Sequence, residues 1–208
     1  MGLKSLLGTL TLANQLTFLR LVAAPFFILT VLDKRFDLAL LVFGCAAVTD
    51  LLDGLTARLL RQESSLGAYL DPAADKIFST VSFVVLTDYP ALFRGIPMTN
   101  RIPVWLTILT ISRDVFIVAV ALMLYLAYGT TRFRPTIWGK LTTVSESLCV
   151  GTFLLFNQLG RAHPVLDVLV WVTLALILVS GFDYVRRTVR TVGTEEPRPR
   201  SETGGASP

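Results

Sequence analysis

The sequence predicts an all-α integral membrane protein: a bundle of six transmembrane helices with a short N-terminal interfacial helix. Three observations predict this fold class. Of the 208 residues, 53% are hydrophobic and only 16% are charged, and the mean hydropathy is +0.64. A soluble domain carries about 25% charged residues. The chain also contains six apolar segments, each close to the ~20 residues with which a helix crosses the hydrocarbon core.

The elements follow in order along the chain. The first 20 residues make a poor signal peptide, because the apolar stretch is broken and lacks a small-residue cleavage site. A short amphipathic helix at the membrane surface is expected there instead. Six crossings are expected at residues 15–32, 38–60, 66–87, 103–128, 137–158 and 164–185. Residues 1–192 then form one membrane domain, and residues 193–208, rich in Pro, Gly, Ser and charge, form a disordered cytoplasmic tail.

The distribution of basic residues predicts the orientation. An even number of crossings places both termini on one side, and 12 of the 19 Lys and Arg residues then fall on that side, with five on the other. Cytoplasmic loops carry the excess of Lys and Arg. Both termini and the connection at 61–65 are therefore expected in the cytoplasm, in a bacterial-type inner membrane. We expect membrane lipid as the surroundings and no nucleic-acid partner.

Four aspartates interrupt the apolar pattern. Asp50 and Asp53 are three residues apart, and Asp71 and Asp75 are four apart, so each pair projects from one face of a helix. A short connection separates the pairs, so two neighbouring antiparallel helices can bring all four carboxylates together. One carboxylate at membrane depth costs about 2.5–3.5 kcal/mol. Such a cluster therefore needs positive charge beside it.

The kind of ligand predicts the kind of cation. Oxygen ligands without nearby His or Cys favour Mg²⁺ or Mn²⁺ over zinc. One such ion or, as we expect, two would suit a phosphoryl or pyrophosphoryl substrate. The alternative is a buried ion-pair network of the aspartates with Arg58 and Lys76. Small residues at the same level leave room for a bulky ligand, although close helix packing also explains them: Gly54, Ala57, Gly67 and Ala68.

A resemblance adds to this interpretation. The pattern resembles the complete signature of the CDP-alcohol phosphatidyltransferase family: Asp50-x2-Asp53-Gly54-x2-Ala57-Arg58-x8-Gly67-x3-Asp71-x3-Asp75. The six-helix layout is similar too, and the resemblance covers nearly all of the chain except the tail. It implies a CDP-linked donor, attack by an alcohol hydroxyl on phosphorus, and release of CMP. It also implies a homodimer.

The resemblance also implies roles for individual residues. Asp50, Asp53, Asp71 and Asp75 would hold the divalent metals, and Asp75 would also be the catalytic general base on the acceptor hydroxyl. The nucleotide of the CDP-lipid would be bound by four residues of the same signature: Gly54, Ala57, Arg58 and Gly67.

A second polar set predicts where the acceptor binds. The run 111-ISRDVFI-117 places Arg113 and Asp114 inside an apolar crossing, and 132-RFRPTIWGKLTT-143 brings Arg134 and Lys140 to the cytoplasmic end of the next. Arg113, Arg134 and Lys140 together predict an anion pocket for a phosphorylated acceptor. For Arg113 the alternative is an internal ion pair with an acidic neighbour.

Both runs are similar to those of phosphatidylglycerophosphate synthases and CMP-forming cardiolipin synthases, as is 14-NQLTFLR-20. This resemblance implies transfer of a phosphatidyl group from CDP-diacylglycerol to glycerol 3-phosphate. Two alternatives stay open. The same transfer to phosphatidylglycerol would give cardiolipin. More distantly, the carboxylates could line the path of a divalent-cation transporter, although transporters spread such features through the bundle, and here the acids concentrate on one helix pair.

Overall fold

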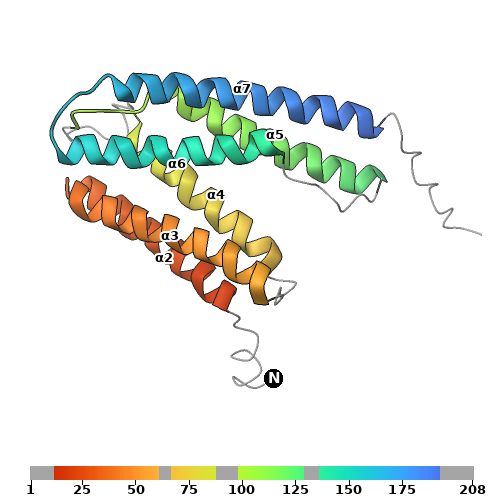
Figure 1. Ribbon diagram of the computed structural model, residues 1–208, viewed down its shortest axis with the longest axis horizontal. Helices are drawn as coiled ribbons and strands as arrows, with labels where there is room; N and C mark the ends of the chain where they lie inside the picture. Colours follow the sequence, from red (N-terminus) through yellow and green to blue (C-terminus); the bar gives the residue numbers. More distant parts are fainter. Residues whose placement is uncertain (1–11, 61–66, 88–97, 129–135, 193–208) are drawn as a thin grey trace, which may run out of the picture.

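The computed structural model describes residues 12–60, 67–87, 98–128 and 136–192. These residues form six α-helices and no strand, which confirms the predicted all-α class (Figure 1). Apart from the end of the last helix, each helix begins and ends within a few residues of the predicted segments. Their bounds are α2 Leu12–Leu32, α3 Phe36–Leu60, α4 Gly67–Leu86, α5 Val104–Tyr128, α6 Ile137–Gln158 and α7 Val165–Val192.

The end of α7 differs most from the prediction. The apolar segment was expected to end at residue 185, but the helix continues to Val192 through the run 186-RRTVRTV-192. Hydropathy marks where a helix leaves an apolar environment, whereas Arg has a high helix propensity and allows the helix to continue into water. The predicted interfacial helix and the predicted tail lie outside the described residues.

Two of the helices are long and apolar enough to cross a membrane: Val104–Leu124 within α5 and Val165–Val189 within α7. Over the described residues, shorter apolar helical stretches occur at Phe18–Leu32, Phe36–Thr49 and Lys76–Leu86. Large apolar side chains also point outward from α5 and α7, among them Met123, which is 70% exposed. These features indicate a membrane protein, and the number of six crossings stays a prediction.

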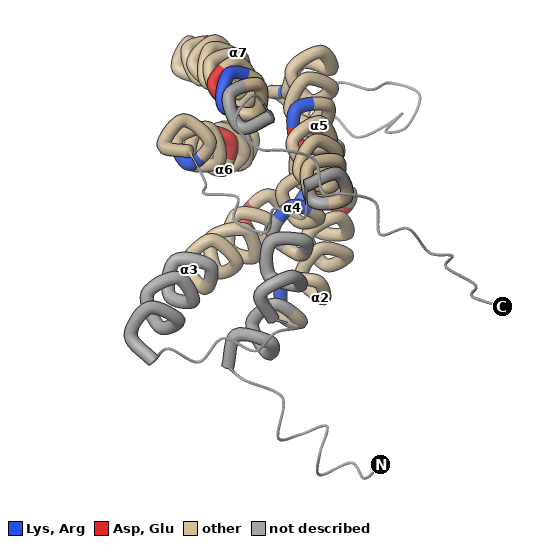
Figure 2. Tube along the Cα trace, turned by 90° about the vertical axis from the view of Figure 1, so that its right-hand side faces the viewer, with Lys and Arg blue, Asp and Glu red and all other residues tan. Residues whose placement is uncertain are grey.

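The helices form two groups. In one, α2 packs against both α3 and α4; in the other, α7 packs against both α5 and α6. Figure 1 shows the two groups one above the other, and Figure 2 shows them from the side, with few charged residues along the described parts of the helices. Helix α6 joins the groups through contacts with α3 and α4, and α4 also contacts α5. Helix α4 therefore lies where the two groups meet.

Aromatic packing fixes the first group. Phe27 of α2 is fully buried, and its ring centroid lies 6.2 Å from that of Phe43 on α3 and 5.7 Å from that of Phe78 on α4. The rings of Phe43 and Phe78 are stacked, 6.0 Å apart. Aromatic pairs in this range add about 0.5–1.5 kcal/mol each beyond their buried area. This contact holds α2 together with α3 and α4, the two helices that carry the aspartates.

Amide hydrogen bonds fasten the second group at the end where α6 finishes. The side chain of Asn157 on α6 accepts from the backbone N–H of Asn100 at 2.9 Å and donates to the Asn100 carbonyl at 2.9 Å. The Asn100 amide donates in turn to the carbonyl of Arg161 at 2.8 Å. The segment before α5 is thereby tied to both the end of α6 and the turn before α7.

Candidate functional site

The aspartates lie on two consecutive helices. Asp50 and Asp53 belong to the C-terminal half of α3, and Asp71 and Asp75 to the first half of α4. Because α3 leads into α4 through the short segment 61–66, both pairs lie toward the same end of the first group (Figure 1). The proposed nucleotide ligands share these segments, with Gly54, Ala57 and Arg58 on α3 and Gly67 opening α4. The side chains of all eight residues lie outside the described part of the structure.

The donor set fits a hard divalent cation, because it consists of carboxylate oxygens alone. Among the side chains that the structure describes, no group of three or more His, Cys, Asp or Glu residues could hold a metal ion. The four aspartates are not among those side chains, so their role as metal ligands stays a prediction.

A cavity of about 660 Å³ lies between α4, α5, α6 and α7. Of the side chains that the structure describes, four charged ones line it: Lys76 of α4, Arg113 and Asp114 of α5, and Lys140 of α6. Sequence reasoning predicted that Arg113 and Lys140 share a pocket, and both line this cavity. Arg134, the third predicted member, lies outside the described residues.

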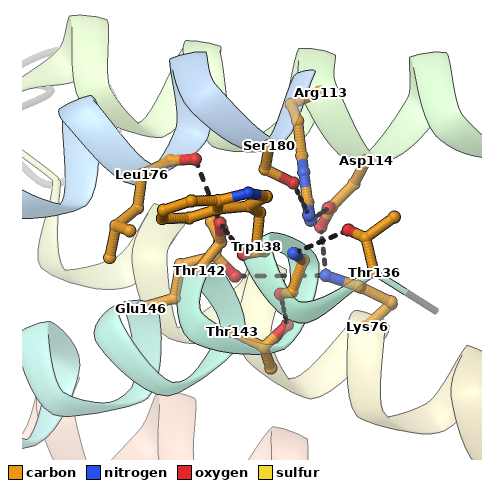
Figure 3. A network of polar contacts seen from close by, with 11 residues as sticks. Lys76, Arg113, Asp114, Thr136, Trp138, Thr142, Thr143, Glu146, Leu176 and Ser180 are labelled. Carbon is orange, nitrogen blue, oxygen red and sulfur yellow. Dashed lines mark hydrogen bonds and ion pairs between the residues drawn. The ribbon is translucent and has the colours of Figure 1, made fainter. Parts of the chain in front are cut away.

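Arg113 is held by two partners. Its Nη1 donates to Asp114 Oδ1 at 2.8 Å, and its Nη2 donates to Ser180 Oγ of α7 at 2.8 Å (Figure 3). Its side chain is only 8% exposed. The internal ion pair considered from the sequence is therefore present, and it occurs at the wall of the cavity. A guanidinium held in this way keeps a fixed direction, and another group can still approach it from the cavity.

Asp114 joins two cations. Its Oδ2 accepts from Lys76 Nζ at 2.8 Å, while its Oδ1 accepts from Arg113. Lys76 also lies 4.0 Å from Oε2 of Glu146, a fully buried carboxylate on α6 (Figure 3). Three helices are thus connected through one ammonium group. Hydrogen bonds between charged groups of this length are about twice as strong as neutral ones.

The start of α6 shapes the cavity next to Arg113. Thr136 caps the helix, with its Oγ1 accepting from the Gly139 N–H at 2.9 Å. A Cβ on Gly139 would lie 3.4 Å from Arg113 Nη2 and 3.2 Å from Thr136 Oγ1. Glycine at this position therefore lets the first turn of α6 approach the guanidinium. Lys140 follows directly; it is exposed, and among the described residues it makes no ion pair.

One wall of the cavity is apolar, and hydroxyl groups of Thr80, Thr143 and Tyr184 line other parts of it. The apolar side chains come from α5, before and after Arg113: Ile111, Val115, Ile117, Val118, Ala119 and Ala121. The cavity therefore has a charged region, where α4 and α6 contribute, and an apolar wall along α5. A ligand that fits it well carries an anionic group and can also have an apolar portion.

Sequence reasoning missed part of this arrangement. Lys76 was considered only as a partner of the aspartates, whereas the structure pairs it with Asp114, 38 residues away. Ser180 gave no signal, because hydroxyls inside apolar helices usually bond to their own backbone. Thr136 did give one, because a threonine directly before an apolar segment is a favoured N-cap residue and predicts a helix start.

Comparisons with known proteins agree with the motif. The model of the family described as CDP-alcohol phosphatidyltransferase matches residues 10–179. The human "Cardiolipin synthase (CMP-forming)" is 32% identical over 202 residues, covering 88% of this chain and 64% of the human protein. The chain thus spans less than two thirds of that relative's length.

Two bacterial relatives are covered more completely. A "Probable phosphatidylglycerophosphate synthase" of Mycobacterium tuberculosis is 31% identical over 189 residues, covering 88% of this chain and 83% of the relative. The "CDP-diacylglycerol--glycerol-3-phosphate 3-phosphatidyltransferase" of Aquifex aeolicus is 29% identical over 184 residues, covering 88% of this chain and 98% of the relative.

Proposed function

The chain belongs to the CDP-alcohol phosphatidyltransferase family, and from this premise we propose that it transfers a phosphatidyl group from CDP-diacylglycerol to glycerol 3-phosphate. In the proposed reaction the acceptor hydroxyl attacks the phosphorus that carries the diacylglycerol, and CMP leaves. Asp75 takes the hydroxyl proton. The active site faces the cytoplasm, and the enzyme works as a homodimer.

One observation carries the choice of acceptor. Of the described Lys, Arg, Asp and Glu side chains that line the cavity, three are basic and one is acidic. This excess of positive charge favours an acceptor that carries its own phosphate. Arg113 offers a fixed guanidinium and Lys140 an ammonium group without an ion-pair partner in the described part of the chain. Arg134 is proposed as a third ligand of the same phosphate.

The donor is proposed to bind beside this cavity, at the start of α4. Gly54, Ala57, Arg58 and Gly67 would contact the nucleotide. Asp50, Asp53, Asp71 and Asp75 would hold two Mg²⁺ or Mn²⁺ ions, which when bound neutralise charge on the pyrophosphate. Arg58 would add a cation for the charge that develops on the departing CMP. No Ser–His or Cys–His pair is part of this proposal, so the acceptor attacks directly.

A second acceptor is favoured by a different observation. The apolar wall along α5 suits an acyl chain, and a phosphodiester is also an anion, so phosphatidylglycerol is the second candidate. In that case the product would be cardiolipin.

The experiment uses the purified full-length chain in lipid nanodiscs with CDP-diacylglycerol and Mn²⁺ or Mg²⁺. CMP release is measured with glycerol 3-phosphate, phosphatidylglycerol, inositol and serine in separate reactions, and the lipid product is identified by mass spectrometry. We expect release with glycerol 3-phosphate and a phosphatidylglycerophosphate product. Release with phosphatidylglycerol alone would replace the first acceptor by the second. Release with none of the four, together with Mn²⁺ flux into vesicles, would favour the transporter.

A further inference from the structure

Lys76 connects the aspartate-bearing segment of α4 with the cavity. It follows Asp75 directly on α4 and lines the cavity with Arg113. Its ammonium group contacts carboxylates of two other helices, at 2.8 Å for Asp114 and 4.0 Å for Glu146. The side chain of Lys76 is 36% exposed, whereas those of Asp114 and Glu146 are 14% and 0% exposed. The lysine thus points from α4 toward two carboxylates fixed inside the second group of helices.

These contacts constrain the rotation of α4 about its axis. Consecutive residues on a helix project about 100° apart, so a fixed direction for Lys76 also fixes the direction in which the α4 backbone projects Asp75. At a radius of about 5–6 Å, a rotation of about 20° would displace a side-chain end by about 2 Å. A misplacement of about 1 Å at a reacting centre can lower the rate about 100-fold. The rate of the proposed reaction should therefore depend strongly on the rotation of α4 about its axis.

Apolar packing holds the second half of α4, because Phe83, Val85 and Leu86 are buried there. Close to Lys76 the described buried apolar residues are Ala74, which has a small contact surface, and Phe78, which packs toward α2 and α3. The ion pairs of Lys76 act in a different direction, toward α5 and α6. Both kinds of contact together therefore set the rotation of α4 around Lys76.

We infer that Asp114 and Glu146 are positioning residues that act through Lys76 to set the rotation of α4, and thereby the direction of Asp71 and Asp75. This inference rests on the proposed function, because it assigns the two aspartates to the reacting centre. It gives a reason for the fully buried Glu146, since a carboxylate is retained at such depth only where it is paired or bonded. It also connects the two sides of the site, because Asp114 holds the arginine of the cavity and the lysine of α4 at once.

Three variants separate this role from general stabilisation. Glu146→Gln keeps the size of the side chain, removes its charge and leaves the pair between Lys76 and Asp114 in place. Lys76→Met removes the ammonium group and keeps an unbranched side chain of similar length. Lys76→Arg keeps a positive charge at this position. Arg187→Met serves as the control, because Arg187 forms an exposed ion pair with Asp183 far along α7.

Four quantities are measured for each variant: kcat and acceptor KM from CMP release, Mn²⁺ binding from the loss of the free-ion EPR signal, and the unfolding midpoint. We expect Lys76→Met to lower kcat at least tenfold and to weaken Mn²⁺ binding at least threefold. Glu146→Gln should also lower kcat and weaken Mn²⁺ binding, by smaller factors than Lys76→Met. Lys76→Arg should have a kcat within about threefold of the wild type. The Arg187 control should match the wild type in kcat and Mn²⁺ binding.

Two results would overturn the inference. A lower unfolding midpoint with unchanged kcat and Mn²⁺ binding would assign the ion pairs to stability alone. A higher acceptor KM with unchanged kcat and Mn²⁺ binding would make Lys76 a direct ligand of the acceptor. If Lys76→Met does not fold, Glu146→Gln carries the same test. A wild-type protein that releases no CMP with any acceptor would remove the proposed function, whereas the Mn²⁺ titration would still test the positioning role.

Discussion

Gly139→Ala should lower kcat/KM for the acceptor while changing the free energy of unfolding little. The added Cβ would lie 3.2 Å from Thr136 Oγ1, which must move by a few tenths of an ångström, and 3.4 Å from Arg113 Nη2, at the limit of ordinary contact. The guanidinium cannot retreat freely, because Nη1 and Nη2 are each held at 2.8 Å. The expected effect is therefore a shifted Thr136 cap and a small displacement of Arg113 at the wall of the cavity.

Two contributions of opposite sign determine the stability. Alanine in place of glycine stabilises a helix by about 0.5–1 kcal/mol. Lengthening one hydrogen bond to a charged group forfeits part of the about 1.5–3 kcal/mol that such a bond contributes. The sum should lie within about 1 kcal/mol of the wild-type free energy of unfolding. If Arg113 binds the acceptor phosphate, its displacement should lower kcat/KM for the acceptor about tenfold, which corresponds to ~1.4 kcal/mol.

The matched control is Gly181→Ala on α7, where a Cβ would meet nothing within 4 Å. This variant should gain the full helix stabilisation of about 0.5–1 kcal/mol and keep the wild-type kinetics. Both variants are compared by thermal unfolding in nanodiscs and by CMP release at varied acceptor concentration. If Gly139→Ala shows wild-type kcat/KM and the same gain in stability as Gly181→Ala, then Arg113 does not bind the acceptor from this position.

Three further predictions follow from the site and the core. Asp75→Asn should abolish CMP release and retain part of the CDP-diacylglycerol binding, measured by equilibrium binding; normal turnover would exclude Asp75 as the base. Arg113→Ala should raise the acceptor KM at least tenfold in steady-state assays, while the exposed Arg187→Ala should not, and equal values for the two would assign Arg113 to structure. Phe27→Ala should lower the free energy of unfolding by about 3–5 kcal/mol in denaturant titrations, because Phe27 is fully buried, whereas Phe182→Ala, at a side chain 72% exposed, should cost far less.

The helices were predictable from the sequence because apolar segments of crossing length are separated by short polar pieces. The bounds of α6 agree with the predicted 137–158, where Pro135 and the Thr136 cap add a local start signal. The end of α7 was not predictable from hydropathy, because the helix continues through arginines after the apolar segment ends. The number of crossings could not be settled in the same way, since within the described residues only α5 and α7 contain an apolar window long enough.

The site was predictable where neighbours in sequence carry the information. The spacing of the aspartates and the motif indicate the family. The internal ion pair, which the sequence offered for Arg113 as the alternative to an anion pocket, is present with the adjacent Asp114. The contact between Lys76 and Asp114 joins residues 38 positions apart, and that between Lys76 and Glu146 joins α4 to α6. Such contacts depend on how helices pack, and a single sequence does not specify that packing through spacing alone.

The amide contacts of Asn157 have a mechanical consequence. They lock the segment before α5 to the end of α6 and to the turn before α7, at the opposite end of these helices from Lys140. Helices tied together at one end should open locally more easily at the other end, where fewer hydrogen bonds cross between them. Exchange of amide hydrogens should accordingly be slowest around Asn157 and faster toward the first turn of α6, beside the proposed acceptor site.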